Sequence, residues 1–244
     1  MFLLNFDAKA LGLTIMLVCA IIIVCCFCFG AIKMKVDIYL IRHGETNLNR
    51  DGCFQGQGLN PPLNENGLEQ AKKLSLVMKF LELDAVYTSP LTRAYQTAEA
   101  LATDRGLPLI EDKRLLEANL GVAEGKLKKV IEDRMPSAYH KWRDLSNWDF
   151  AFDKGETRRQ VLSRFMDFIK SREESDYKHI AVVTHAGVLR SFLASQGIQQ
   201  NKISNTEIIH CVYGDGKLSI VKDRGNEKEN TVVPTRSSLN NSGR

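Results

Sequence analysis

The sequence predicts an α/β fold, a three-layer α/β/α sandwich around a mainly parallel central sheet. Two observations carry this prediction. Short apolar runs typical of buried strands alternate with stretches whose apolar residues recur at helical spacing, and two of the strand-like runs end in a histidine and a glycine. Strands joined through helices run parallel and need cover on both faces, so helices are expected on either side of the sheet. The chain has 244 residues, 44% of them hydrophobic, which is enough for one such domain.

The expected elements follow in chain order. Strands are expected at residues 36–41, 84–88 and 180–184. A helix is predicted by the apolar spacing of Leu68, Ala71, Leu74, Met78 and Leu81, and a second one at residues 94–102. Thr157 can cap a third helix, whose buried face is expected to contain Val161, Phe165, Phe168 and Ile169. Residues 206–213 and 217–222, separated by two glycines and an aspartate, predict a terminal hairpin.

The first candidate site residues lie where the first strand ends. The run Arg42-His43-Gly44-Glu45-Thr46 comes directly after residues 36–41. Open α/β sheets build their sites at strand ends, and a glycine there lets backbone amides approach a ligand closely. An arginine beside a histidine is by itself more often a solvated pair, so this motif needs companions.

Three further segments supply those companions. His185 and Gly187 follow the strand at residues 180–184, Arg93 falls in the first turn of the helix after residues 84–88, and Glu117 stands in a glycine-bounded loop. Guanidinium groups bind phosphate oxygens bidentately and favour the charge that develops during phosphoryl transfer. The set therefore predicts an anion site containing a nucleophile, without a need for a metal ion or other cofactor.

With these four ordered motifs, residues 35–221 resemble the histidine phosphatase superfamily, the phosphoglycerate-mutase-like group. The match extends to Asn49 after the first motif and to the Gly155-Glu156-Thr157 segment. Asn60 stands where an aspartate is frequent in the family, and Lys154 replaces the usual first glycine. These departures concern loop shape, so they bear on substrate fit and not on the reaction.

The resemblance implies a role for each site residue. His43 would attack phosphorus and carry a phosphohistidine, and Glu117 would protonate the leaving oxygen and then activate water. His185, assigned with these two to catalysis, would hold the phosphoryl oxygens together with the substrate-binding residues Arg42, Arg93 and Asn49. The alternatives for single residues are a capping arginine for Arg93, a surface carboxylate for Glu117 and a satisfied core histidine for His185.

An aromatic group lies in the variable segment between Glu117 and Gly155: Tyr139, Trp142, Trp148, Phe150 and Phe152. Core packing is the first expectation for such a group. The resemblance implies instead that this region caps the pocket, where some of these side chains would contact substrate.

The predicted function is hydrolysis of a small phosphorylated metabolite, a phosphomonoester, without a metal ion. The first alternative is a phosphoglycerate-type mutase, although the segment at residues 126–154 looks short for the extended mutase insertions. The second is a membrane-anchored module that binds phosphorylated ligands without turnover; the complete set of catalytic residues argues against it. The net charge of +4, from 33 basic and 29 acidic residues, argues against a nucleic-acid binder.

Residues 11–32 contain no charge and are long enough to cross a hydrocarbon core of about 30 Å as one helix. Lys33 and Lys35 follow this segment, which favours a single-pass protein with its catalytic domain in the cytoplasm. A cleaved signal peptide fits less well, because a leading positive cluster is missing. Met34 resembles an ordinary start for the family, and a chain that begins there would be cytoplasmic.

The expected domain organisation has three parts: residues 1–34 as the segment with the membrane helix, residues 35–223 as the histidine phosphatase domain, and residues 224–244 as a disordered polar tail. Four of the six cysteines fall inside the apolar segment, which is not a disulfide framework.

Overall fold

The computed structural model describes residues 35–221, and these form the predicted α/β fold. Six strands make one mixed sheet in the order β3-β2-β4-β1-β5-β6. The strands are β1 (Val36–Arg42), β2 (Ala85–Thr88), β3 (Leu109–Glu111), β4 (His179–Thr184), β5 (Ile208–Gly214) and β6 (Lys217–Ile220). Strands β1 to β4 pair in parallel, and β5 and β6 add the antiparallel hairpin that the sequence predicted.

Seven helices and two short 3-10 turns connect these strands within the described range. The helices are α2 (Asn47–Arg50), α3 (Glu65–Met78), α4 (Thr92–Thr103), α5 (Lys128–Arg134), α6 (Pro136–Arg143), α7 (Arg158–Lys170) and α8 (Ala186–Ser195), and the turns are Lys113–Leu115 and Gly121–Ala123. The short elements β3, α2, α5 and α6 were not predicted, because each is too short to give a periodic pattern. Helix α8 was not predicted either, because it is apolar along most of its length and lacks a clear polar face.

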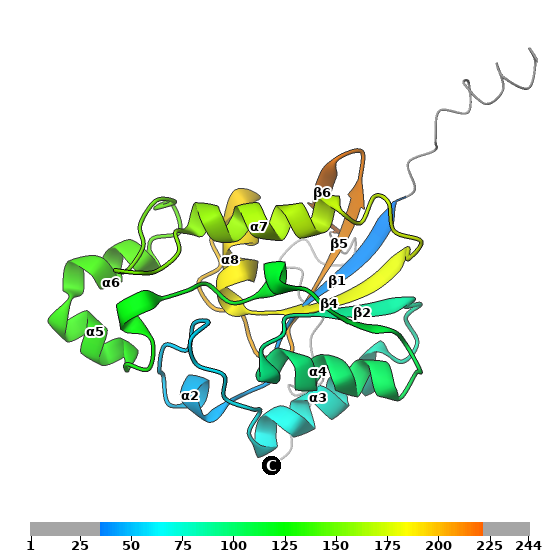
Figure 1. The fold of residues 1–244 in the computed structure, drawn as a ribbon, viewed down its shortest axis with the longest axis horizontal. Helices are drawn as coiled ribbons and strands as arrows, with labels where there is room; N and C mark the ends of the chain where they lie inside the picture. The colour runs from blue at the N-terminus through cyan, green and yellow to red at the C-terminus, as the bar shows by residue number, and fades with distance from the viewer. Residues whose placement is uncertain (1–34, 222–244) are drawn as a thin grey trace, which may run out of the picture. The chain divides into compact units, whose positions relative to one another are not determined.

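Helices cover both faces of the sheet, so the three layers are present (Figure 1). One buried cluster joins β1 and β4 to α7 and α8, with Phe165, Phe168 and Phe192 at its centre. A second cluster joins the other face to α3 and α4 through Leu74, Met78 and small residues such as Ala98.

The predicted helices differ from the observed ones at their ends. The expected helix with Leu68 and Leu81 begins at Glu65, because Asn64 caps it by accepting a hydrogen bond from the Gly67 backbone N–H at 2.8 Å. It ends at Met78, before Leu81, and Leu68 is 44% exposed although it shares the apolar spacing. The expected cap at Thr157 is confirmed: it forms a capping box with Gln160.

The strand β1 sits at the centre of the sheet and delivers the site. Its residues pair with β4 on one side and β5 on the other, so that Ile38 faces Ile180 and Cys211. Because β1 and β4 are parallel neighbours, the residues that follow them, His43 and His185, emerge at the same sheet edge. Helices α5 and α6 lie beyond this edge, away from the sheet layers (Figure 1).

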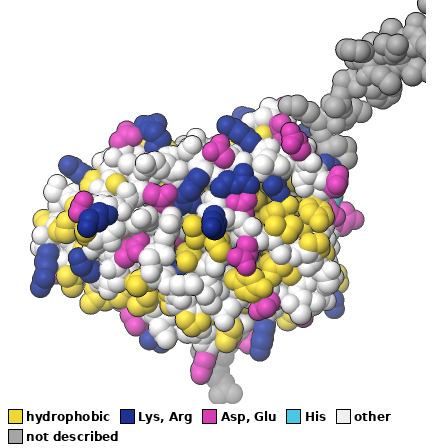
Figure 2. Space-filling model, in the orientation of Figure 1, with side chains coloured by type: hydrophobic (Ala, Val, Ile, Leu, Met, Phe, Trp, Pro, Cys, Tyr) yellow, Lys and Arg dark blue, Asp and Glu magenta, His cyan; other side chains and the backbone are white. Residues whose placement is uncertain are grey.

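Two expectations on the chain ends lie outside the described residues: the membrane helix at 11–32 and the disordered tail at 224–244. Within residues 35–221, no helix is both long and apolar enough to span a bilayer. On the face drawn in Figure 2, basic and acidic side chains are interspersed.

Candidate active site

His43 follows β1 and is 3% exposed. Its backbone N–H donates to the Thr184 carbonyl at 3.0 Å, which extends the β1–β4 ladder by one residue. Its ring Nδ1 lies 2.7 Å from the Gly44 carbonyl oxygen. A carbonyl can only accept, so Nδ1 carries the proton and Nε2 is left with a free lone pair. This is the tautomer that a nucleophilic histidine needs.

Gly44 permits this arrangement because a side chain would not fit there. A Cβ atom at Gly44 would lie 2.7 Å from the Gly67 carbonyl oxygen, at the start of α3. The Gly44 backbone N–H also donates to Thr97 Oγ1 in α4 at 3.0 Å. The turn after β1 is therefore fixed from two helices on the same face of the sheet.

His185 follows β4 and places its ring beside that of His43, with 5.1 Å between the ring centroids. Its Nε2 lies 2.8 Å from Ser89 Oγ, at the end of β2. Ser89 Oγ also accepts from the Leu91 backbone N–H, at 3.3 Å, so its own proton is free to go to His185 Nε2. In that arrangement the proton of His185 is on Nδ1, which is buried without any protein partner.

Two arginines flank the histidines, one of them half-buried (Arg42) and the other fully buried (Arg93). Arg93 is fully buried and donates to the carbonyls of Gly56 and Leu59, at 2.9 and 3.0 Å. Arg42 donates to the Ile203 carbonyl at 2.5 Å. Neither forms a salt bridge with any described residue, and the Nε of each lacks a partner. The alternative of a capping role for Arg93 is not supported, because its guanidinium donates to carbonyls of a loop and not to the end of a helix.

Burial and charge together keep the histidines neutral. Burial lowers the pKa of His43 well below its usual value, and the charges of Arg42 and Arg93 lower it further. Burial also lowers the pKa of His185, with a further contribution from Arg93. Burial lowers the pKa of both Arg42 and Arg93 to about 10, so both are cationic at neutral pH.

Glu117 is held by backbone N–H groups. Its Oε1 accepts from the Ala118 N–H at 2.8 Å and its Oε2 from the Gly187 N–H at 3.2 Å, in the first turn of α8. A carboxylate is favoured at this end of a helix dipole. Close approach depends on Gly187, since a Cβ there would lie 2.3 Å from Glu117 Oε1. Glu117 lines the cavity described below, so it is not merely a surface carboxylate.

Asn49 belongs to the cap of α2. Its Oδ1 accepts from the Thr46 N–H at 2.8 Å, while its Nδ2 has only a long contact, 3.5 Å, to Asn205 Oδ1. Asn205 in turn donates to the His43 carbonyl at 2.9 Å. The amide donor of Asn49 is thus weakly engaged and available to an anion.

The predicted site residues meet at one cavity of about 140 Å³. Its lining includes Arg42, His43, Asn49, Arg93 and Glu117. His185 does not contribute to the lining and stands behind it, against the His43 ring. Buried polar atoms are normally paired, so the unpartnered nitrogens of Arg42, Arg93 and His185 indicate a site that a multivalent acceptor such as phosphate would complete.

Several lining or supporting residues were missed from the sequence: Ser89, Lys128, Arg190, Lys202 and Asn205. Arg190 carried a usable signal, because it is the one charged residue within the apolar helix α8. Ser89 stands at a strand end like the histidines. The two lysines and Asn205 are ordinary surface types in the sequence and gave no such signal.

Part of the aromatic group packs as a core and part faces the cavity. Tyr139 and Phe152 are buried with Phe54 in a small cluster of their own. Trp142 packs edge-on against Phe54, at 4.7 Å between centroids, and also lines the cavity. Core packing is thus confirmed for Tyr139 and Phe152, while contact of Trp142 with substrate stays a prediction.

Potential metal ligands are not grouped in this part of the chain. Across residues 35–221, no three His, Cys, Asp or Glu side chains are arranged so as to hold an ion.

Comparison with known proteins identifies the class. A sequence model of the histidine phosphatase superfamily (branch 1) matches residues 38–224. The chain belongs to this superfamily, as its four motifs predicted.

Its relatives include phosphatases that are named for different substrates. Phosphoserine phosphatase 1 of Hydrogenobacter thermophilus is 30% identical over 68% of this chain and 79% of its own length. Fructose-2,6-bisphosphatase TIGAR B of Danio rerio is 38% identical over 54% of this chain and 51% of its own. The solved structure of mycobacterial glucosyl-3-phosphoglycerate phosphatase is 25% identical, with a TM-score of 0.69 over 76% of this chain and 97% of that one. The predicted enzyme class, a phosphatase-like hydrolase, is confirmed at this level.

Proposed function

We propose that the protein is a metal-independent phosphomonoesterase that acts on a small phosphorylated metabolite through a phosphohistidine at His43. The observation that carries this proposal is the state of His43: its Nε2 is free, its pKa is held low, and two guanidinium groups without salt bridges to described residues stand beside it. A neutral nucleophile next to fixed positive charge is suited to attack a phosphate dianion.

The proposed reaction has two steps. Arg42, Arg93 and Asn49, which line the cavity, hold the phosphoryl oxygens while His43 Nε2 forms a bond to phosphorus and the ester P–O bond breaks. The unpartnered Nδ1 of His185, beside the His43 ring, joins them once the phosphoryl group is bound. Glu117 gives its proton to the leaving oxygen. A water molecule then attacks phosphorus, Glu117 takes a proton from it, and the N–P bond breaks to release phosphate.

The alternatives make different demands on the same site. A mutase would have to retain the phosphohistidine and return the phosphoryl group to a second hydroxyl. The three relatives described above are all phosphatases by name, which favours hydrolysis. A binding module without turnover would need the two arginines but neither a nucleophile nor Glu117.

Phosphate release tests the proposal. The full chain is incubated with phosphoserine, fructose 2,6-bisphosphate, glucosyl-3-phosphoglycerate and p-nitrophenyl phosphate, each with and without EDTA. Release of phosphate that EDTA does not change is expected for at least one of them. Activity lost with EDTA and restored by a divalent cation would contradict the metal-independent mechanism, and isomerisation in place of phosphate release would favour the mutase.

We further propose that residues 11–32 anchor the protein in a membrane, with the catalytic domain in the cytoplasm. The support is the uncharged length of this segment and the lysines that follow it. The full chain should stay in the membrane pellet after a carbonate wash, while Ile22→Lys/Val24→Lys should be released, because each buried lysine costs about 3 kcal/mol. Release of the unmodified chain, or a native N-terminus found only at Met34, would defeat the anchor.

A further inference from the structure

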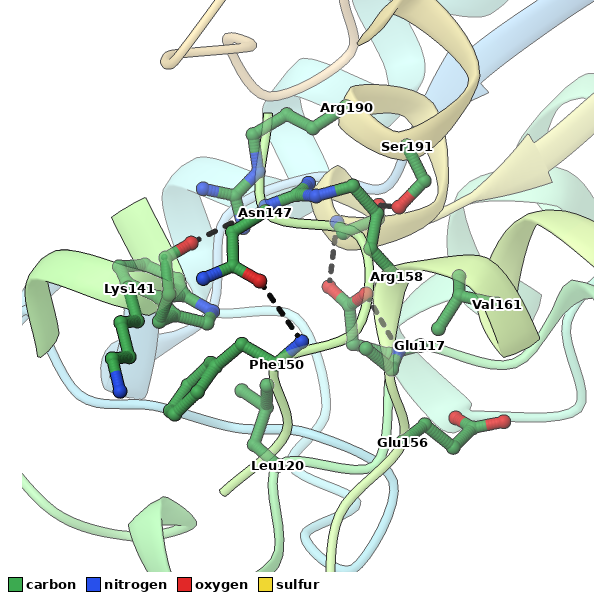
Figure 3. A pocket seen from close by; sticks show the side chains of 13 residues that line it. Glu117, Leu120, Lys141, Asn147, Phe150, Glu156, Arg158, Val161, Arg190 and Ser191 are labelled. Carbon is green, nitrogen blue, oxygen red and sulfur yellow. Dashed lines mark hydrogen bonds between the residues drawn. The ribbon is translucent and has the colours of Figure 1, made fainter. Parts of the chain in front are cut away.

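A second cavity, of about 50 Å³, adjoins the catalytic cavity, and we refer to it as the accessory pocket (Figure 3). Four residues line both cavities: Glu117, Leu120, Trp142 and Arg190. Arg158, at the start of α7, lines only the accessory pocket. The shared lining places the two cavities next to each other.

The accessory pocket is lined by basic side chains that form no salt bridge with any described residue. Arg158 donates from Nη2 to the Trp142 carbonyl at 3.2 Å, and its buried Nε has no partner. Arg190 donates from Nε to the Ala186 carbonyl at 3.3 Å, with its guanidinium 5.0 Å from the centre of the Trp142 ring. Lys141 also lines the pocket, but its side chain is exposed and its ammonium group points away from Arg158 and Arg190 (Figure 3). Within residues 35–221, none of the three forms a salt bridge.

The acidic residues at this pocket are already engaged. Glu156 pairs with Arg164 at 3.0 Å and accepts the Asn119 N–H at 2.8 Å. Glu117 accepts two backbone N–H groups and also faces the catalytic cavity. Neither carboxylate accepts a hydrogen bond from Arg158 or Arg190, and among the described residues only the charges of nearby Asp144 and Glu117 favour the cationic forms of Arg158 and Arg190, respectively.

The positive charges of Arg158 and Arg190 also repel each other. Burial lowers the pKa of Arg158 to about 10, and the charge of Arg190 lowers it further. Burial likewise lowers the pKa of Arg190. Two partly desolvated like charges are costly, and an anion bound between them would relieve that cost.

We propose that the accessory pocket binds a second anionic group, a carboxylate or a phosphate, on the same molecule whose phosphoryl group occupies the catalytic cavity. This inference rests on the proposed function, because it places the reacting phosphoryl group at His43. Arg158 and Arg190 bind the second group through charge-assisted hydrogen bonds, and Arg190, which lines both cavities, fixes its position relative to the reacting end. The substrates are therefore phosphomonoesters that carry two anionic groups a short distance apart.

Matched substrates test the second anion directly. O-phosphoserine and O-phosphoethanolamine differ by one carboxylate, while the bisphosphate and monophosphate of ethylene glycol differ by one phosphate. We expect kcat/KM to be higher for the doubly anionic member of at least one pair. Arg158→Gln should reduce that preference about tenfold or more, the size expected for a hydrogen bond to a charged group, and Arg158→Lys should restore part of it.

Arg159→Gln is the control, because it removes the same charge from the next residue. Arg159 is exposed and pairs with Asp149 at 2.8 Å, outside both cavities. It should leave the preference unchanged. An equal loss on both members of each pair in Arg158→Gln, or an equal loss of preference in Arg159→Gln, would overturn the proposal while the phosphatase activity stands.

A binding measurement separates this proposal from the proposed chemistry. In the His43→Ala background, calorimetric titration gives Kd for the same four molecules without turnover. Tighter binding of a doubly anionic member, lost on adding Arg158→Gln, would support the accessory pocket even if no substrate were hydrolysed. Equal Kd values within both pairs, or no measurable binding of any of the four, would overturn it.

Discussion

The carboxyl ends of β1 and β4 and the segment that carries α5 and α6 differ in how their side chains are held. At the strand ends, His43 and His185 are buried and tied to neighbouring elements through backbone and Ser89 contacts. In the α5–α6 segment, a small aromatic cluster separate from the two main cores holds residues such as Tyr139 and Phe152. The two histidines assigned to the reaction thus directly follow central strands of the sheet, whereas Trp142, which lines the cavity, stands on an added segment.

The largest effect is expected at Arg93, in the first turn of α4 beside the two histidines. Arg93→Met keeps most of the volume but removes the guanidinium, so kcat/KM should fall about 10²- to 10³-fold for every phosphomonoester. Steady-state kinetics on alkyl and aryl phosphates would measure the fall. Arg105→Met is the matched control, since Arg105 also donates to two carbonyls, those of Met78 and Leu81, outside the site. Similar losses in both variants would mean that Arg93 acts only on the fold.

The next effect depends on the leaving group. Glu117→Gln cannot donate a proton, so alkyl phosphates should lose about 10²-fold in kcat while p-nitrophenyl phosphate, whose leaving group needs no proton, should lose only a few-fold. Equal losses on the two substrates would remove Glu117 from proton transfer. Gly187→Ala sharpens the test, because its Cβ would displace the carboxylate and should produce the same dependence on the leaving group.

The buried histidines should make stability depend on pH. Because the pKa values of His43 and His185 are lowered in the folded state, the unfolded chain binds protons that the folded chain does not as pH falls below about 6.5. The free energy of unfolding should then fall, approaching about 1.4 kcal/mol per pH unit for each histidine, and should be insensitive to these groups at higher pH. Urea unfolding between about pH 8 and pH 5 measures this slope.

His43→Gln/His185→Gln should flatten that slope. The single variant His140→Gln, at a residue outside the cavity, should not. An unchanged slope in the double variant would show that the pKa values of the two histidines are not lowered in the folded protein.

The smallest effect, on thermal stability, is expected at Lys154, after the segment that carries α5 and α6. Lys154 has φ 62°, in the left-handed region that costs a non-glycine residue about 1–2 kcal/mol. Lys154→Gly should raise the midpoint of thermal unfolding by a few degrees, in line with about 1 kcal/mol in a domain of this size, and leave kcat unchanged. A lower midpoint would show that the Lys154 side chain stabilises the loop by more than the backbone strain costs.

Much of the fold and the core of the site could be predicted because they depend on local patterns. The apolar run before His43 and the one before His185 predicted two strand ends, and parallel pairing then placed both at one edge. The segment with α5 and α6 has no comparable periodicity, so neither helix could be predicted.

Contacts between residues distant in the sequence explain what could not be predicted. Glu117 accepts a hydrogen bond from the N–H of Gly187, seventy residues later. Arg190 lines the cavity because α8 packs against α7 and the sheet. Asn60, which stands where an aspartate is frequent in the family, is a second example of a contact that could not be predicted. Its Oδ1 accepts a hydrogen bond from the Thr92 N–H at 2.7 Å, as an aspartate oxygen could. Its sequence position alone did not reveal this partner.

The covalent intermediate is the central claim, and trapping it is the most direct test. The full chain is mixed with a ³²P-labelled substrate identified by the release assay, quenched with alkali within the first turnover, and digested for peptide mapping. We predict an acid-labile, alkali-stable label on the peptide that contains His43, absent in His43→Ala. Turnover without any label on the protein, or a label on a different residue that persists in His43→Ala, would contradict the assignment of His43 as the nucleophile.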